Sequence, residues 1–145
     1  MIAFIRKDGI KVRQIQEHPI LSKSNCRAIN QSITLGVKGP KWYVLSSLAH
    51  EYGHCLTVRN GVDGLRFGTA LFYELGIVRT KEDGKELIRE EHTAWKLGYA
   101  AMRANDIGVD SDLLAHRDVL VQSHVQWINY LLSKSRIRVA AAINR

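Results

Sequence analysis

Residues 45–54 read Leu-Ser-Ser-Leu-Ala-His-Glu-Tyr-Gly-His, and they contain an HExxH pattern that runs from His50 to His54. On a helix, two residues four positions apart lie about 40° apart around the axis and one turn apart along it. Both imidazoles can therefore reach the same metal ion. Glu51 is rotated by about 100° from His50, which places it beside the metal, where a base for a metal-bound water belongs.

The spacing of apolar residues predicts one helix over residues 41–60. Pro40 is typical of the beginning of a helix, and Asn60-Gly61 is typical of the end of one. Small residues, rather than Lys and Glu, surround the two histidines, as if something must approach them closely. The alternative is that both histidines lie on an ordinary solvated or packed face. The predicted apolar face consists of Trp42, Val44, Leu45, Leu48, Ala49, Tyr52 and Leu56.

A second long helix is predicted from Thr80 to Asn105, with Thr80 as its N-cap. Glu91 lies in the middle of the apolar stripe of this helix. A carboxylate that faces a core needs a strong partner, and a metal ion is such a partner. Glu91 is therefore the expected third metal ligand, with Glu90 and His92 as weaker candidates. The alternative for Glu91 is a buried salt bridge to an arginine.

His50-Glu51-x-x-His54 followed by Glu91-x-x-Ala94 resembles the gluzincin metallopeptidase pattern, most closely that of small ImmA/IrrE-like intracellular peptidases. The resemblance implies that His50, His54 and Glu91 bind Zn²⁺ and that Glu51 is the catalytic base. It covers about a third of the chain. Trp95 departs from the pattern, because many gluzincins carry Asp or Asn at this position. The polar contact which that residue often makes to a metal ligand must then come from elsewhere or be missing.

Three residues are candidates for stabilising the oxyanion that forms during hydrolysis. Tyr43 shares the histidine face of the first helix, Tyr73 lies in the segment after it, and His124 lies on an apolar face further along the chain. The sequence does not choose among them. For His124 we favour a structural role as a hydrogen-bonded core histidine.

The rest of the chain predicts a small α+β fold. Residues 2–15 have the pattern of a β-hairpin around Asp8-Gly9, and residues 28–37 have that of a strand. A short helix is expected near residues 69–75. A third long helix is expected over residues 112–133, capped by Ser111.

These elements together predict a minimal zincin-like fold with three long helices and an N-terminal antiparallel sheet. We expect one metallopeptidase domain over residues 1–133 and a basic C-terminal tail over residues 134–145, disordered at its end.

Composition narrows the class of protein. The 145 residues contain no apolar stretch of membrane-spanning length, and the N-terminus does not have the pattern of a signal peptide. Cys26 and Cys55 do not form a disulfide framework, and we expect both to be reduced thiols in a cytoplasmic protein.

The net charge of +7 is concentrated at the two ends of the chain. Residues 1–41 and 134–145 are strongly basic, whereas the segment between them is mildly acidic. Such ends allow a weak contact with nucleic acid, although a solvated surface is the simpler interpretation.

The function expected from these residues is hydrolysis of protein or peptide substrates by a zinc metallopeptidase. One alternative is a SprT-like protease that acts on DNA-bound proteins, with His92 as the third ligand. Another is a non-enzymatic, basic nucleic-acid-binding or interaction module. The oligomeric state and the cleavage specificity are left open.

Overall fold

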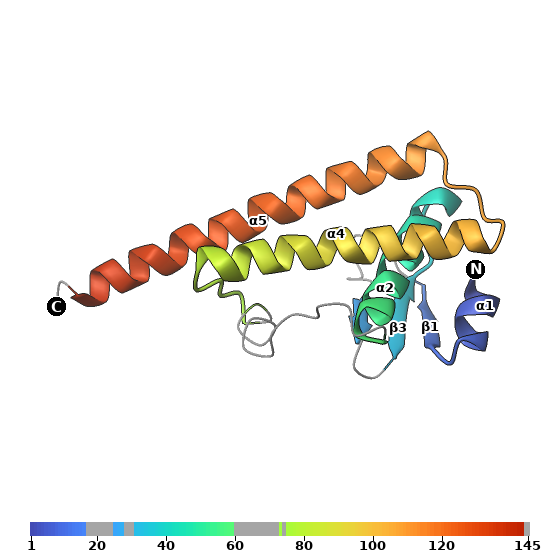
Figure 1. The fold of residues 1–145 in the computed structure, drawn as a ribbon, viewed down its shortest axis with the longest axis horizontal. Coiled ribbons are helices and arrows are strands. Elements are labelled where there is room, and N and C mark those ends of the chain that lie inside the picture. The colour runs from blue at the N-terminus through green and yellow to red at the C-terminus, as the bar shows by residue number, and fades with distance from the viewer. Residues whose placement is uncertain (17–24, 28–30, 60–72, 74, 144–145) are drawn as a thin grey trace.

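The computed structural model describes residues 1–16, 25–27, 31–59, 73 and 75–143. The described helices are α1 (Ile2–Lys7), α2 (Lys41–Arg59), α4 (Lys81–Ala104) and α5 (Ser111–Ile143). Helices α4 and α5 lie side by side, and the C-terminal part of α5 extends beyond the first turn of α4 (Figure 1). The strands, α1 and α2 gather near the opposite end of α4.

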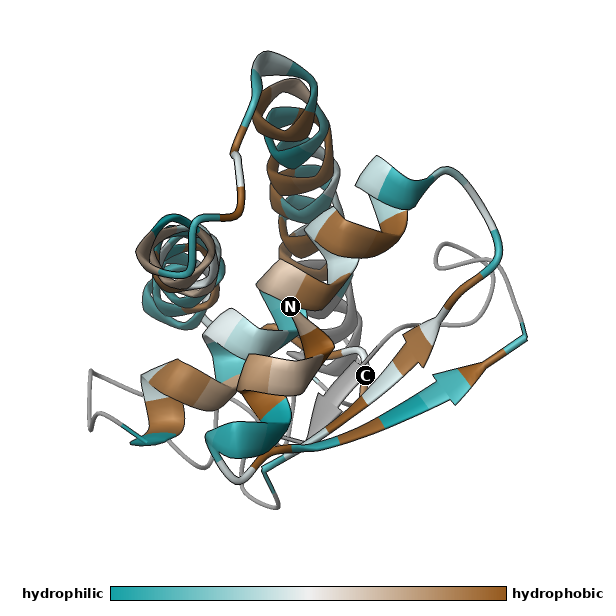
Figure 2. Ribbon diagram, turned by 90° about the vertical axis from the view of Figure 1, so that its right-hand side faces the viewer, coloured by the Kyte–Doolittle hydropathy of each residue, from teal (hydrophilic) through white to brown (hydrophobic). Residues whose placement is uncertain are grey.

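The strands form a three-stranded mixed sheet with β3 (Ser32–Gly36) in the middle. β1 (Lys11–Ile15) is parallel to β3, and β2 (Asn25–Arg27) is antiparallel to it. Successive side chains of a strand point to opposite faces of the sheet, and Val12, Ile33 and Leu35 are buried beneath the helices. The helices lie on one side of this sheet (Figure 2).

The predicted hairpin over residues 2–15 is wrong, because its first half is helix α1. Ile5 of this helix is fully buried in the core, and Asp8-Gly9 ends the helix instead of turning a hairpin. Gly9 has a φ of 83°, and the amide of Ile10 donates to the carbonyl of Ile5. This is the Schellman arrangement that glycine favours after a helix. The dipeptide Asp8-Gly9 is thus compatible both with the end of a helix and with the turn of a hairpin.

Helix α2 begins directly after Pro40, whose carbonyl accepts the amides of Tyr43 and Val44. One side of α2 packs on α1 and the sheet through Leu48, Tyr52 and Cys55. Another side packs on α4 through Ala49. The motif helix is therefore buried on more than one side, and it places the histidines between layers of the fold.

Helix α4 starts with the predicted cap. The side chain of Thr80 accepts the amide of Asp83, and the side chain of Asp83 accepts the amide of Thr80, which completes a capping box. The buried stripe of α4 contains Leu87, Trp95 and Met102.

Helix α5 differs from the prediction at both ends. Asp110, rather than Ser111, caps it, because the Asp110 Oδ1 accepts the amide of Leu113 at 2.9 Å. The helix also continues to Ile143, ten residues beyond the expected end at Ser133. No Gly or Pro interrupts residues 134–143, so nothing local stops the helix.

The predicted fold class is therefore corrected. The sheet is mixed rather than an N-terminal antiparallel one, and a fourth helix, α1, takes the place of the first strand. The short helix expected over residues 69–75 lies outside the described residues except at positions 73 and 75. No described helix combines the length and apolar character needed to cross a membrane.

Candidate metal centre

Two glycines bring α2 and α4 into close contact. A Cβ atom on Gly53 would overlap the backbone carbonyl of Ala94, and a Cβ atom on Gly98 would overlap that of Ala49. The pairs run in opposite directions along the two helices, so the helices cross antiparallel. Because the residues next to the histidines are small, α4 can pack closely against α2, and α4 carries Glu91.

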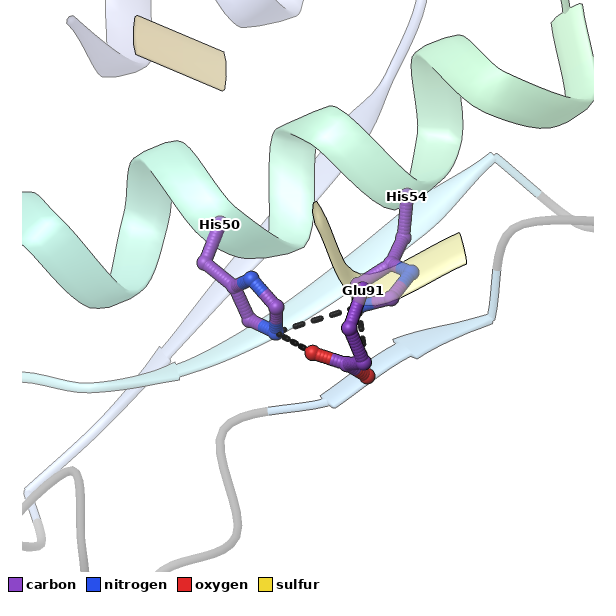
Figure 3. Close-up of side chains that lie close together, drawn as sticks. All are labelled: His50, His54 and Glu91. Atoms are coloured by element: carbon purple, nitrogen blue, oxygen red, sulfur yellow. Dashed lines mark hydrogen bonds and ion pairs between the residues drawn. The ribbon is translucent and has the colours of Figure 1, made fainter. Parts of the chain in front are cut away.

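This crossing brings His50, His54 and Glu91 together (Figure 3). The Nε2 atoms of the two histidines are 3.0 Å apart. Glu91 Oε2 lies 3.4 Å from His50 Nε2, and Glu91 Oε1 lies 3.6 Å from His54 Nε2. The side chains are largely shielded, with 14–17 % of their surface exposed.

These distances fit a tetrahedral metal site. Ligand atoms about 2.05 Å from a zinc ion at tetrahedral angles lie about 3.3 Å from one another. The observed separations of 3.0, 3.4 and 3.6 Å surround this value. Two imidazoles and one carboxylate also form a donor set that Zn²⁺ accepts, and these three donors account for three of the four positions of a tetrahedral site. The residues present therefore fit such an ion.

His50 is positioned by an aromatic ring. Its imidazole stacks on the indole of Trp95, with ring centroids 4.3 Å apart and an interplanar angle of 29°. The Nδ1 atom of His50 is buried and has no hydrogen-bond partner within the described part of the chain. Stacking on Trp95 thus restricts the orientation of the His50 ring.

His54 is positioned by a carboxylate. Its Nδ1 atom lies 2.6 Å from Glu90 Oε1, the length of a strong charge-assisted hydrogen bond. A carboxylate on the far nitrogen fixes the tautomer of a metal-binding histidine and directs Nε2 toward the metal. Glu90 is therefore a hydrogen-bond partner of His54 in this structure and does not belong to the group of His50, His54 and Glu91.

The protonation of the cluster without metal reflects this crowding. Burial lowers the pKa of His54, but the hydrogen bond to Glu90 and the charges of Glu90, Glu91 and Glu51 outweigh it and raise the pKa to about 10. Burial, together with the charges of His54 and His124, lowers the pKa of His50. Burial raises the pKa of Glu91 to about 7, with an opposing contribution from His54. Carboxylates and imidazoles are thus held together away from water, as at many functional sites.

Two of the three oxyanion candidates lie beside the cluster. His124 Nε2 is 3.5 Å from Glu91 Oε1, and the hydroxyl of Tyr73 is 3.2 Å from His124 Nε2. Burial raises the pKa of Tyr73, and the charges of Glu91 and Glu90 raise it further. Tyr43 instead contacts His116, with ring centroids 4.2 Å apart. The structure thus separates Tyr43 from the other two.

Two further residues complete the comparison with the sequence. Glu51 is 8 % exposed and adds to the negative field at His54. His92 is exposed on α4 and does not belong to the three-residue group. Sequence reasoning weighed Glu90 only as a metal ligand, because its contact with His54 depends on the crossing of two helices that are distant in the sequence. The contacts of Tyr73 and His124 join distant segments and had no local signal.

Comparison of the chain with protein-family models, with curated proteins and with solved structures found no match.

Proposed function

We propose that this protein is a zinc-dependent metallopeptidase. The observation that supports the proposal most directly is the triangle of ligand atoms that His50, His54 and Glu91 form at the crossing of α2 and α4. The two motif histidines come from one helix, and the carboxylate comes from another. A site assembled from two elements argues against a chance HExxH pattern.

The chemistry of the donor set favours a transition-metal ion such as zinc over magnesium or calcium. Imidazole nitrogen suits Zn²⁺, whereas Mg²⁺ and Ca²⁺ prefer oxygen ligands. When bound, Zn²⁺ supplies a water with a pKa near 7 and polarises a carbonyl oxygen. Three protein ligands and an open position are the usual arrangement of a catalytic site, whereas structural sites use four.

In this proposal each residue of the site has a separate role in peptide hydrolysis. His50, His54 and Glu91 would hold the metal, and Glu90 and Trp95 would keep the two imidazoles in orientation. Glu51 takes a proton from the attacking water and then passes it to the leaving amine. His124 lies beside Glu91 and Tyr73 lies beside His124, so these two residues would be the donors to the developing oxyanion.

The first test replaces the proposed base. Glu51→Gln should retain bound zinc and lose hydrolysis by about 10²- to 10⁴-fold, because the substitution removes the proton acceptor but none of the ligands. Zinc content is measured by elemental analysis, and cleavage of a peptide library is measured by mass spectrometry. Undiminished cleavage by the variant would remove Glu51 from this role.

The second test replaces the third ligand. Glu91→Gln should strongly reduce the zinc content of the purified protein, whereas Glu82→Gln, on an exposed position of the same helix, should not. His92→Ala is the matched test of the SprT-like alternative and should also leave zinc in place. Loss of zinc from the His92 variant, with normal zinc in the Glu91 variant, would reverse the assignment.

The non-enzymatic alternative gives a different outcome in the same measurements. An interaction module without a functional site would bind no zinc, or would bind zinc and cleave no peptide in the library. In either case the wild-type protein and the Glu51→Gln variant would behave alike.

A further inference from the structure

The C-terminal half of α5 carries two exposed aromatic rings. Trp127 is 49 % exposed and Tyr130 is 45 % exposed. Their rings stack on each other at a centroid distance of 5.3 Å and an angle of 27°. The Nζ atom of Lys134 lies 4.8 Å from the centroid of the Tyr130 ring. One side of the helix thus presents a stacked aromatic pair with a cation at its end, and we call these three residues the α5 aromatic platform.

The same part of the chain contains no carboxylate. From Val119 to the C-terminus there is no Asp or Glu, whereas Lys134, Arg136, Arg138 and Arg145 all carry positive charge. Surface helices usually mix both signs of charge. Only the C-terminal end of α5 extends past the start of α4 (Figure 1), because Ile128 and Leu131 still pack beside Leu87. The platform therefore lies in a positive region that favours a polyanionic partner.

Between Gln122 and Lys134, the other exposed residues are polar. Ser123, Gln126 and Asn129 are exposed around the aromatic pair. A helix that lies on a membrane needs an apolar face that continues over several turns. Over residues 122–134 the two rings are set among polar side chains and do not provide such a face, but they do provide flat surfaces on which a planar group can stack.

We propose that the α5 aromatic platform binds single-stranded nucleic acid. Unpaired bases stack on Trp127 and Tyr130, and Lys134 with the arginines that follow it neutralises the phosphates. Bases within a duplex do not offer their faces to side chains, so the proposal is specific for single strands. From Trp127 to Arg138 the helix spans about 17 Å, which is enough for several nucleotides. This surface is distinct from the metal centre and does not depend on zinc.

The experiment measures binding of a labelled oligothymidylate of about 15 nucleotides to the full-length protein by fluorescence anisotropy. The affinity should fall as salt rises, with a slope of log K against log salt near −0.7 for each phosphate that is neutralised. Base stacking should also quench tryptophan fluorescence, and the quenching should be lost in Trp127→Phe if Trp127 is the ring in contact. An oligouridylate of equal length tests RNA in parallel.

Variants decide whether the aromatic platform is responsible. Trp127→Ala combined with Tyr130→Ala should weaken binding tenfold or more, whereas Trp127→Phe alone should retain much of the affinity because a ring remains. Val119→Ala is the matched control, since Val119 is 66 % exposed on the same helix and should have no effect. Circular dichroism checks that the variants are folded, and zinc content should be unchanged in all of them.

Three results would overturn the proposal. One is equal affinity for the double variant and the wild type, which would reduce the interaction to charge alone. Another is equal affinity for a duplex of the same length. The third is binding of anionic phospholipid vesicles or polyglutamate that is as tight as that of the oligonucleotide and equally dependent on Trp127. Failure of this proposal leaves the metallopeptidase proposal intact, because no residue is shared between them.

Discussion

At the scale of single residues, the site depends on how each histidine is held. His54 has a carboxylate partner in Glu90, whereas His50 has an aromatic partner in Trp95 and a buried Nδ1 atom without a partner in the described chain. A carboxylate raises the basicity of a ligating imidazole, and a stacked ring only restricts its orientation. The two histidines should therefore contribute unequally to metal affinity.

Glu90→Ala tests this difference. The variant should bind zinc about 10- to 100-fold more weakly than the wild type, because His54 loses the hydrogen bond that fixes its tautomer. Zinc affinity is measured by competition with a chromophoric chelator. Glu82→Ala, at an exposed position on the same helix, should have wild-type affinity. Equal affinities in the two variants would mean that the 2.6 Å contact contributes nothing to the site.

At the scale of secondary-structure elements, the crossing of α2 and α4 determines whether the ligands meet. The helices touch through their backbones at Gly53 and Gly98, where a side chain would overlap a carbonyl of the other helix. Overpacking of this kind cannot be relieved by a change of rotamer, because the opposing atoms belong to the backbone. The distance between the histidines and Glu91 therefore depends on Gly53 and Gly98, although neither glycine is a candidate metal ligand.

Gly53→Ala should lower the free energy of unfolding by about 1–3 kcal/mol, because α2 and α4 must move apart to admit the methyl group. It should also weaken zinc binding, since Glu91 moves with α4. Stability is measured by urea denaturation of the metal-free protein. Gly108→Ala is the control, because a Cβ atom there meets no atom within 4 Å. A stable Gly53→Ala variant with normal zinc affinity would contradict the backbone contact.

At the scale of the whole molecule, metal binding and folding should be linked. The ligands come from helices separated in sequence by residues 60–80, so the unfolded chain does not hold them together. Free zinc at about 100 times its dissociation constant would add about 2.7 kcal/mol to the stability of the folded state.

Added zinc should therefore raise the melting temperature of the metal-free protein by roughly 8 °C for a chain of this size, and a chelator should reverse the shift. Differential scanning calorimetry measures the effect. The Glu91→Gln variant should show a much smaller shift at the same zinc concentration. An equal shift in both proteins would place the stabilising ion elsewhere.

The sequence by itself determined the local features of the site. The geometry of a helix places His50 and His54 on one side, and the apolar stripe around Glu91 turns that carboxylate inward. The cap at Thr80 was equally local and is observed as predicted. These features depend on residues within one or two turns of each other, so no other part of the chain was needed to infer them.

Only the tertiary structure decided how these pieces combine. Asp8-Gly9 suits a hairpin turn and a helix end alike, and packing of Ile5 in the core selects the helix. The parallel pairing of β1 with β3 and the contacts of His54 with Glu90 and of His124 with Glu91 join distant segments. Such contacts depend on which surfaces pack together, and that choice is made by the burial of the whole core rather than by any local pattern.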